Sequence, residues 1–294
     1  MSFWLGCAIW AYKDWIGDLF PVGSQSKDFL SLYSRRFTAV EGNTTFYSIP
    51  DAVTVQRWAT ATPPGFKFCP KLPRTLTHRG LLTPTVPETL AFLEKMQGLG
   101  DRLGVVFAQL PPTYGPKDFA DLAMFLQTVS QAVAGQVSLA VEVRHLAWFE
   151  AEQAQRLNDL LAQFGVAKVL LDTRPIYQCP DNPQIASKRH KPKVPMQATL
   201  TAPVSLIRYI SHPEWQYNEP FLQAWVGQVE QWLQQNRQVY FFVHCPLEER
   251  SPRTARHFQQ LLEQQGVVVP ELPWNTIEAN SSIAAASATQ LSLF

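Results

Sequence analysis

Short apolar runs alternate with amphipathic stretches along most of this 294-residue chain. Runs of about four to eight apolar or β-branched residues are typical of buried strands, whereas the stretches between them repeat apolar residues with a helical period. Strands that alternate with helices favour parallel pairing, because each helix carries the chain back across the sheet. The expected strands cover residues 3–8, 37–44, 66–72, 104–110, 137–143, 167–172, 204–210 and 239–244.

Helix starts support this division of the chain. Asp51 is a suitable N-cap for residues 52–60, and Pro87 stands in the first turn of the helix after the third strand. Eight strand and helix units predict a single-domain α/β (β/α)8 TIM barrel over residues 1–275, a fold that commonly takes about 250 residues. A doubly wound open sheet is the alternative, but no Gly-rich phosphate turn follows the first strand. Residues 276–294 lack periodicity and are expected to form a disordered tail.

The sixth unit departs from the pattern. Residues 174–203 contain six prolines and no helical period, so a long irregular loop is expected to replace most of the sixth crossover helix. It leaves the C-terminal end of a strand, on the face where barrel enzymes hold their active sites. Two interpretations of its charges are open: a solvated loop, or a binding site for an anion or a nucleic-acid backbone. They are Arg174, Lys188, Arg189, Lys191 and Lys193 against Asp181.

Charged residues end several of the expected strands. Strand side chains alternate between the barrel interior and the helix layer, and the last interior positions line the mouth at the C-terminal ends of the strands. Glu41, Asn43 and Thr45 share one face of the second strand, and Glu142 shares a face with Arg144 in the fifth. The mouth is therefore expected to gather three acids and three bases, with His244 at the end of the eighth strand: Glu41, Glu142, Asp172, Lys71, Arg144 and Arg208.

Buried charges of this kind must pair with one another or meet a ligand, because an unpaired buried charge costs several kcal/mol. A structural lattice of ion pairs is one interpretation. A ligand site is the favoured one, because six charges converge from separate strands where apolar residues would pack as well. The candidate catalytic residues are Glu41, Lys71, Glu142 and Asp172.

Aromatic residues follow the strands near the same mouth. They either cover the top of the barrel or stack on a flat ligand. His78 is either a hydrogen-bonded loop residue or an acid/base group. The candidate substrate-binding residues are Trp10, Tyr12, Asn43, Tyr47, His78, Arg144, Trp148, Arg208 and His244, and Trp15 and Phe46 belong to the same aromatic set.

Composition excludes several classes of partner. The net charge is +1 and only 17% of residues are charged, so bulk attraction to nucleic acid or to a membrane surface is absent. No apolar run approaches the roughly 18 residues of a membrane span, and the opening residues lack the basic region and the small-residue cleavage site typical of a signal peptide. Four cysteines without paired spacing favour reduced thiols, and we expect a cytoplasmic protein.

No metal or other cofactor is expected. Suitable ligand types occur at Glu41, Glu142, Asp172, His212 and His244, but the nearby cations would oppose a divalent ion. A phosphate-binding Walker loop and a G-x-S-x-G nucleophile turn are both absent. Cys245 follows His244 directly, so the two side chains are expected on opposite faces of the strand rather than as a reactive pair.

Several segments resemble the motifs of the YecE-like family, domain of unknown function 72. They include GCAIWAYKDW, VEGNTTFYSIP, RWATATPPGFKFCPKLPRTLTH, VFAQLPP, AVEVRHLAWF and LLDT, in order over about residues 4–270. The resemblance implies a TIM barrel and no assigned reaction. The chain departs from the family pattern at residues 7–9, 209–211 and 244–245, so the late half of the mouth is expected to differ.

These observations predict a metal-independent enzyme that acts on a small polar or anionic metabolite, such as a sugar derivative or a phosphate ester, by general acid/base chemistry. Hydrolase, isomerase and lyase reactions all remain open. Lys71, Arg144 and Arg208 would hold the anion, and Glu41 or Glu142 would transfer protons. The alternatives are a nucleic-acid-binding barrel that uses the basic loop and mouth aromatics, and a non-catalytic scaffold.

Overall fold

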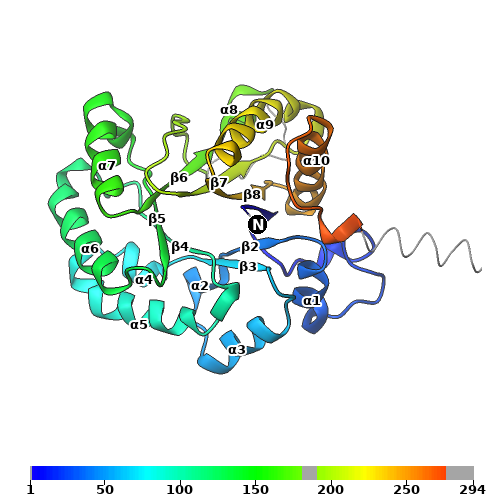
Figure 1. The fold of residues 1–294 in the computed structure, drawn as a ribbon, viewed down its shortest axis with the longest axis horizontal. Helices are drawn as coiled ribbons and strands as arrows, with labels where there is room; N and C mark the ends of the chain where they lie inside the picture. Colours follow the sequence, from blue (N-terminus) through cyan, green and yellow to red (C-terminus); the bar gives the residue numbers. More distant parts are fainter. Residues whose placement is uncertain (1, 181–190, 276–294) are drawn as a thin grey trace, which may run out of the picture.

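Parallel strands lie at the centre of the molecule, and helices surround them (Figure 1). The computed structural model describes residues 2–180 and 191–275. The strands are β1 (Phe3–Cys7), β2 (Ala39–Gly42), β3 (Lys67–Pro70), β4 (Val105–Gln109), β5 (Ser138–Glu142), β6 (Ala167–Asp172), β7 (Val204–Ile210) and β8 (Gln238–His244). The α-helices are α1 (Phe29–Ser34), α2 (Thr44–Tyr47), α3 (Ala52–Thr60), α4 (Arg74–Thr77), α5 (Val86–Gln97), α6 (Phe119–Ala132), α7 (Ala151–Gln163), α8 (Arg174–Gln178), α9 (Glu219–Gln234) and α10 (Ser251–Gln264).

The strands form two parallel sheets. One has six strands in the order β1-β8-β7-β6-β5-β4, and the other pairs β2 with β3. The larger sheet curls so that its edge strands, β1 and β4, lie beside β2 and β3 (Figure 1). The α/β class and the parallel pairing agree with the prediction, and each described strand lies within one residue of, or inside, an expected range.

A tyrosine hydroxyl interrupts the pairing of β1 with β2. The amide of Thr38 donates to the carbonyl of Leu5 at 3.1 Å, as in an ordinary parallel ladder. One step further, the amide of Cys7 donates to the hydroxyl of Tyr33 at 2.6 Å, and that hydroxyl donates to the carbonyl of Ala39 at 3.0 Å. The side chain thus joins backbone groups that would otherwise be unpaired, which are costly when buried.

Two large apolar clusters fill most of the interior among the described residues: an inner core inside the sheets and an outer core between strands and helices. Alternate strand residues, among them Trp4, Phe107, Tyr240 and Phe242, pack inside the sheets, and the rings of Trp4 and Tyr240 stack at 4.5 Å. The opposite faces of the strands pack against the helices in a larger cluster. The inner core fills the part of the interior toward the N-terminal ends of the strands, so polar side chains at the C-terminal ends lie above an apolar floor.

The chain after β6 contains the predicted irregular loop, with one small addition. Arg174–Gln178 form the short helix α8, and residues 191–203 form neither helix nor strand. Asp181, Lys188 and Arg189 of the predicted basic loop lie outside the described residues, as does the predicted tail, residues 276–294. The nucleic-acid alternative depends on this loop and stays a prediction. Across the described residues, every helix is too short or too polar to span a lipid bilayer.

The second strand is shorter than the sequence pattern predicts. It ends at Gly42, and Thr45 lies in the helical turn α2 instead of on the strand face. The hydroxyl of Thr45 donates to the carbonyl of Lys71 at 2.7 Å. The expectation that Thr45 points into the mouth as part of the polar strand face is therefore wrong, and its role is to connect α2 to the end of β3.

Candidate functional site

Arg208 lies at the centre of a buried group of charged side chains. From β7 it donates two hydrogen bonds to Glu41 of β2, from Nε to Oε2 at 2.8 Å and from Nη2 to Oε1 at 2.9 Å. Its Nη1 donates to Oε2 of Glu142, on β5, at 2.5 Å. The three side chains are at most 4% exposed. One guanidinium therefore joins carboxylates from two distant strands.

Arg144 is the second cationic partner of Glu142. Its Nε donates to Oε1 of Glu142 at 2.6 Å, and its Nη2 donates to Oε1 of Gln109 at 2.5 Å. With 16% of its side chain exposed, Arg144 reaches solvent where Arg208 does not. We call Glu41, Glu142, Arg144 and Arg208 the ion network. Its two negative and two positive charges cancel.

The two carboxylates of the ion network are held in the ionised form. Burial favours the neutral acid of Glu142, but attraction to Arg144 and then Arg208 outweighs it and lowers the pKa to about 2. Burial likewise opposes ionisation of Glu41, and the charge of Arg208 overcomes it, so that this pKa lies well below the ordinary value. Both groups carry their charge across the neutral range.

His244, at the end of β8, completes the coordination of Glu41. Its Nε2 lies 2.8 Å from Oε2 of Glu41. Burial lowers the pKa of His244 to about 4, although the charge of Glu41 acts in the opposite direction. The neutral ring therefore donates its Nε2 proton to the carboxylate and orients it without adding charge.

Lys71 lies beside the ion network but is not part of it. Its side chain follows β3 and is buried, and Nζ donates to Oε1 of Gln109 at 2.7 Å. The same atom lies 3.7 Å from the centre of the Phe46 ring. Among the described residues it forms no ion pair with a carboxylate. Burial first, and then repulsion from Arg208, lowers the pKa of Lys71 to about 7 despite the attraction of the two carboxylates.

Burial, together with the charge balance of the ion network, explains why the pKa of Lys71 is lowered. The two carboxylates are already neutralised by two guanidiniums, so a protonated Lys71 would add one uncompensated charge to a buried site. An amine with a pKa near 7 has its electron pair free in about half of the molecules at neutral pH. The arrangement can therefore accept a proton or attack an electrophilic carbon at physiological pH.

His78 packs against the ring of Phe46. The two rings meet edge-on at 5.2 Å, and Nδ1 of His78 is 2.8 Å from the hydroxyl of Thr77. Burial, followed by repulsion from Lys71, lowers the pKa of His78 to about 4. The ring is neutral at pH 7, so it can accept or relay a proton but does not supply a positive charge.

Asp172 does not face the mouth, contrary to the prediction. Its carboxylate accepts hydrogen bonds from Nε and Nη2 of Arg174 at 2.9 and 2.8 Å, and from Nε1 of Trp225 on α9 at 2.8 Å. Trp225 belongs to the outer core between strands and helices. Val169, which is three residues before Asp172 in β6 and therefore on the opposite face, belongs to the inner core. Strand alternation thus directs Asp172 to the helix layer, where it fixes α8 and α9.

The predicted aromatic cluster is also divided. Trp148 is fully buried and donates Nε1 to the carbonyl of Tyr114 at 3.0 Å, so it covers the core and does not line the mouth. Trp10 packs edge-on against Trp58 of α3 at 5.2 Å, and Tyr12 packs on Trp15 at 5.7 Å. Asn43 donates its side-chain amide to the carbonyl of Ala8 at 3.0 Å, which joins the ends of β2 and β1, and Tyr47 is 81% exposed.

Two residues of the site region, Gln109 and Glu248, were missed by the sequence reasoning. Gln109 binds both Lys71 and Arg144, and its position two residues after the interior Phe107 could have revealed it. Lys191, which the sequence analysis placed in the basic loop, has its pKa lowered by burial and then by repulsion from Arg208. In Glu248, burial raises the pKa to about 8, and Oε1 is buried with no hydrogen-bond partner among the described residues.

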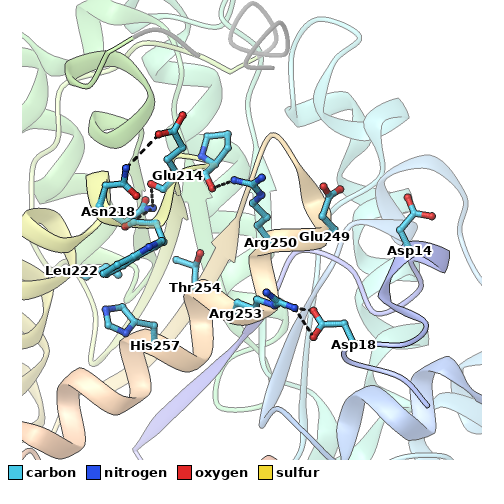
Figure 2. Close-up of a pocket in the computed structure, with 13 residues that line it drawn as sticks. Asp14, Asp18, Glu214, Asn218, Leu222, Glu249, Arg250, Arg253, Thr254 and His257 are labelled. Carbon is cyan, nitrogen blue, oxygen red and sulfur yellow. Dashed lines mark hydrogen bonds and ion pairs between the residues drawn. The ribbon is translucent and has the colours of Figure 1, made fainter. Parts of the chain in front are cut away.

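A different cavity, of about 700 Å³, lies between the starts of α9 and α10 (Figure 2). The two arginines that line it, Arg250 and Arg253, already form hydrogen bonds with other residues that line the cavity. Arg253 donates to both carboxylate oxygens of Asp18, at 3.0 and 3.1 Å, and Arg250 donates to the carbonyl of Pro213 at 2.5 Å. It contains no member of the ion network, and we regard it as a weaker candidate. Within residues 2–180 and 191–275, no three His, Cys, Asp or Glu side chains gather as a metal ion requires.

Comparison with known proteins identifies relatives across almost the whole chain. Residues 4–277 match the family model described as "Protein of unknown function DUF72". The chain is 37% identical over 246 residues to UPF0759 protein YecE of Escherichia coli K12, covering 83% of this chain and 86% of YecE. It is 26% identical over 152 residues to UPF0759 protein YunF of Bacillus subtilis, covering 50% and 52% of the two chains.

Two crystal structures are similar in fold. A DUF72 family protein from Enterococcus faecalis V583 superposes with a TM-score of 0.68 at 18% identity, covering 92% of this chain and 97% of the other. A DUF72 family protein from Thermotoga maritima MSB8 gives 0.66 at 20% identity, covering 90% and 100%. At this identity the likeness concerns the fold alone.

Proposed function

The chain belongs to the DUF72 family of proteins of unknown function, and we propose that this member is a metal-independent enzyme that acts on a small polar, anionic metabolite through Lys71. The observation that supports the proposal is the state of that lysine. Its amine is buried, has a pKa of about 7 and is held by one amide oxygen. Such an amine acts as a general base or nucleophile at neutral pH.

The contacts favour different roles for the two arginines. Arg208 uses all three of its nitrogens on Glu41 and Glu142, so it orients these carboxylates and leaves little donor capacity for a substrate. Arg144 reaches solvent and is the better partner for an anionic group. In this scheme the substrate anion lies at Arg144, and Lys71 takes a proton from the carbon beside it. Isomerisation and elimination reactions both begin with such a proton transfer.

We also propose that the two sheets close into one (β/α)8 barrel and that residues 1–275 form one domain. The hydrogen bonds across Tyr33 support closure between β1 and β2. Between β3 and β4, the amide of Gly104 donates to the carbonyl of Phe68 at 2.7 Å, and that of Leu72 donates to Phe107 at 2.9 Å. Buried thiols at Cys7, Cys69 and Cys245 are in keeping with a reducing cytoplasm as its location.

Acetylation of lysines at different pH values tests the state of Lys71. Because only the neutral amine reacts, we expect half-maximal modification of Lys71 near pH 7, measured by peptide mass spectrometry after brief acetic anhydride pulses. Lys168 is the matched buried control, since burial alone lowers its pKa to about 8. Lys117 is the exposed control. If the midpoint for Lys71 coincides with that of Lys117, the proposed function loses its support.

Replacement of Lys71 by methionine is expected to stabilise the fold by roughly 1–2 kcal/mol at neutral pH, as the removal of a strained functional group often does. The pKa of Lys71 is 10.5 in the unfolded chain and about 7 in the folded one, so the unfolded chain binds the proton more tightly. At low pH the protonated lysine therefore lowers the free energy of unfolding. The advantage of the variant should be full below about pH 7 and should vanish as the pH approaches about 10.5. Urea unfolding of both proteins across this range measures it, and a pH-independent difference would contradict the prediction.

A further inference from the structure

A groove of about 750 Å³ lies next to the candidate site. Residues 46–49, which begin in α2, form one wall, and residues 73–79, which contain α4, form the other. Its volume is within the range of small-molecule sites, which is roughly 300–1,000 Å³.

Phe46 connects this groove to Lys71. One side of its ring is contacted by the Lys71 amine at 3.7 Å, while the edge-on contact with His78 at 5.2 Å lies at the groove. A ligand in the groove is therefore separated from the amine by a single ring. The groove can hold the part of a substrate that does not react while the reacting end enters beside Lys71.

The wall that starts in α2 presents apolar groups to solvent. Tyr47 is 81% exposed and Ile49 is 45% exposed, and the Tyr47 ring packs edge-on against Phe46 at 5.2 Å. An exposed aromatic ring beside an exposed aliphatic side chain is a suitable surface for a planar ring, which gains stacking and apolar contact there.

The opposite wall carries cations. Arg74 and Arg79 line the groove, and neither forms an ion pair with an acid within residues 2–180 and 191–275. The neutral His78 lies between them in sequence and adds a hydrogen-bonding ring. Two arginines without carboxylate partners are suited to bind a phosphate group, which their planar guanidiniums recognise well.

We propose that the groove binds a substrate handle in which a planar aromatic ring is joined to a phosphate, as in a nucleotide. The ring lies on Tyr47 and Ile49, and Arg74 and Arg79 hold the phosphate. This inference rests on the proposed function, because the handle matters for catalysis only if Lys71 reacts with the other end. Binding energy from such a remote group serves to position the reacting atoms.

Calorimetric titration with adenosine monophosphate, ribose 5-phosphate and inorganic phosphate tests the proposal. We expect adenosine monophosphate to bind most tightly. Tyr47→Ala should weaken its binding at least about tenfold and leave ribose 5-phosphate unchanged, because only the ring is lost. Arg74→Gln/Arg79→Gln should weaken both organic phosphates by about tenfold or more. Arg35→Gln, an exposed arginine outside the groove, is the matched control and should change nothing.

Two results overturn the proposal: adenosine monophosphate that binds no more tightly than inorganic phosphate, or affinities that the groove variants leave unaltered. The acetylation midpoint of Lys71, measured on the same variants, separates this failure from that of the proposed function. A midpoint near pH 7 with no nucleotide binding rejects the groove alone. Nucleotide binding with an ordinary lysine midpoint supports the groove as a binding site and rejects the role of Lys71.

Discussion

Replacement of Arg208 by methionine is expected to lower the free energy of unfolding by about 3–5 kcal/mol, the usual cost of removing one partner from a buried ion pair. The substitution keeps most of the side-chain volume but takes three hydrogen bonds from Glu41 and Glu142. Glu142 retains Arg144, whereas Glu41 retains only the neutral His244. The main cost is therefore an uncompensated charge on Glu41, and urea denaturation measures it.

Two further variants distinguish this explanation from a simple packing defect. Adding Glu41→Gln to the Arg208→Met variant removes the uncompensated charge and should restore a large part of the lost stability. Arg253→Met breaks an ion pair that is largely exposed, with 74% of the arginine side chain in solvent, and should cost less than about 1 kcal/mol. A cost for Arg208→Met equal to that of Arg253→Met would contradict a tightly coupled ion network.

Alternation along strands predicted much of the ion network from sequence. Glu142 and Arg144 were expected on one face because they are two residues apart, and they form a 2.6 Å contact. Glu41 and Arg208 were expected at the same mouth although 167 positions separate them, because both lie near the ends of strands in one parallel architecture. The pattern could not predict which acid pairs with which base, because the choice between a lattice of ion pairs and a ligand site depends on the distances between the side chains.

Asp172 shows where alternation fails. Its strand, Ala167–Asp172, is buried on both faces, so hydrophobicity does not tell which face is inner. Lys168 is on the same face four residues earlier, and its amine donates to Asn158 and Gln197 at 3.2 and 3.1 Å. A lysine near the start of an otherwise apolar strand was the available signal that this face meets the helix layer.

The short helices α2 and α4 explain why the groove beside Lys71 was not predicted from the sequence. α2 and α4 are only four residues long and have no helical period that a sequence pattern could reveal. They nevertheless build both walls of the groove and bring Phe46 to Lys71. The lowered pKa of Lys71 could not be predicted from the sequence either, because it depends on burial and on carboxylates that are already paired with arginines.

Gly6→Ala is expected to cost at least about 3 kcal/mol, the upper end of overpacking effects, because β1 and β2 approach closely at this position. A Cβ at Gly6 would lie 1.8 Å from the carbonyl oxygen of Ala39 and 2.8 Å from the Tyr33 hydroxyl. Adding Tyr33→Phe to the Gly6→Ala variant removes that hydroxyl but should not restore stability, since the clash with the Ala39 backbone remains. Thermal and urea unfolding measure the loss.

Gly227→Ala is the matched control for this prediction. Gly227 lies within α9, and a Cβ there meets no atom within 4 Å. Alanine in a helix interior is more stable than glycine by roughly 0.5–1 kcal/mol, so this variant should gain stability where Gly6→Ala loses it. A Gly6→Ala protein as stable as the parent would mean that β2 can move away from β1, which would contradict closure of the barrel at Tyr33.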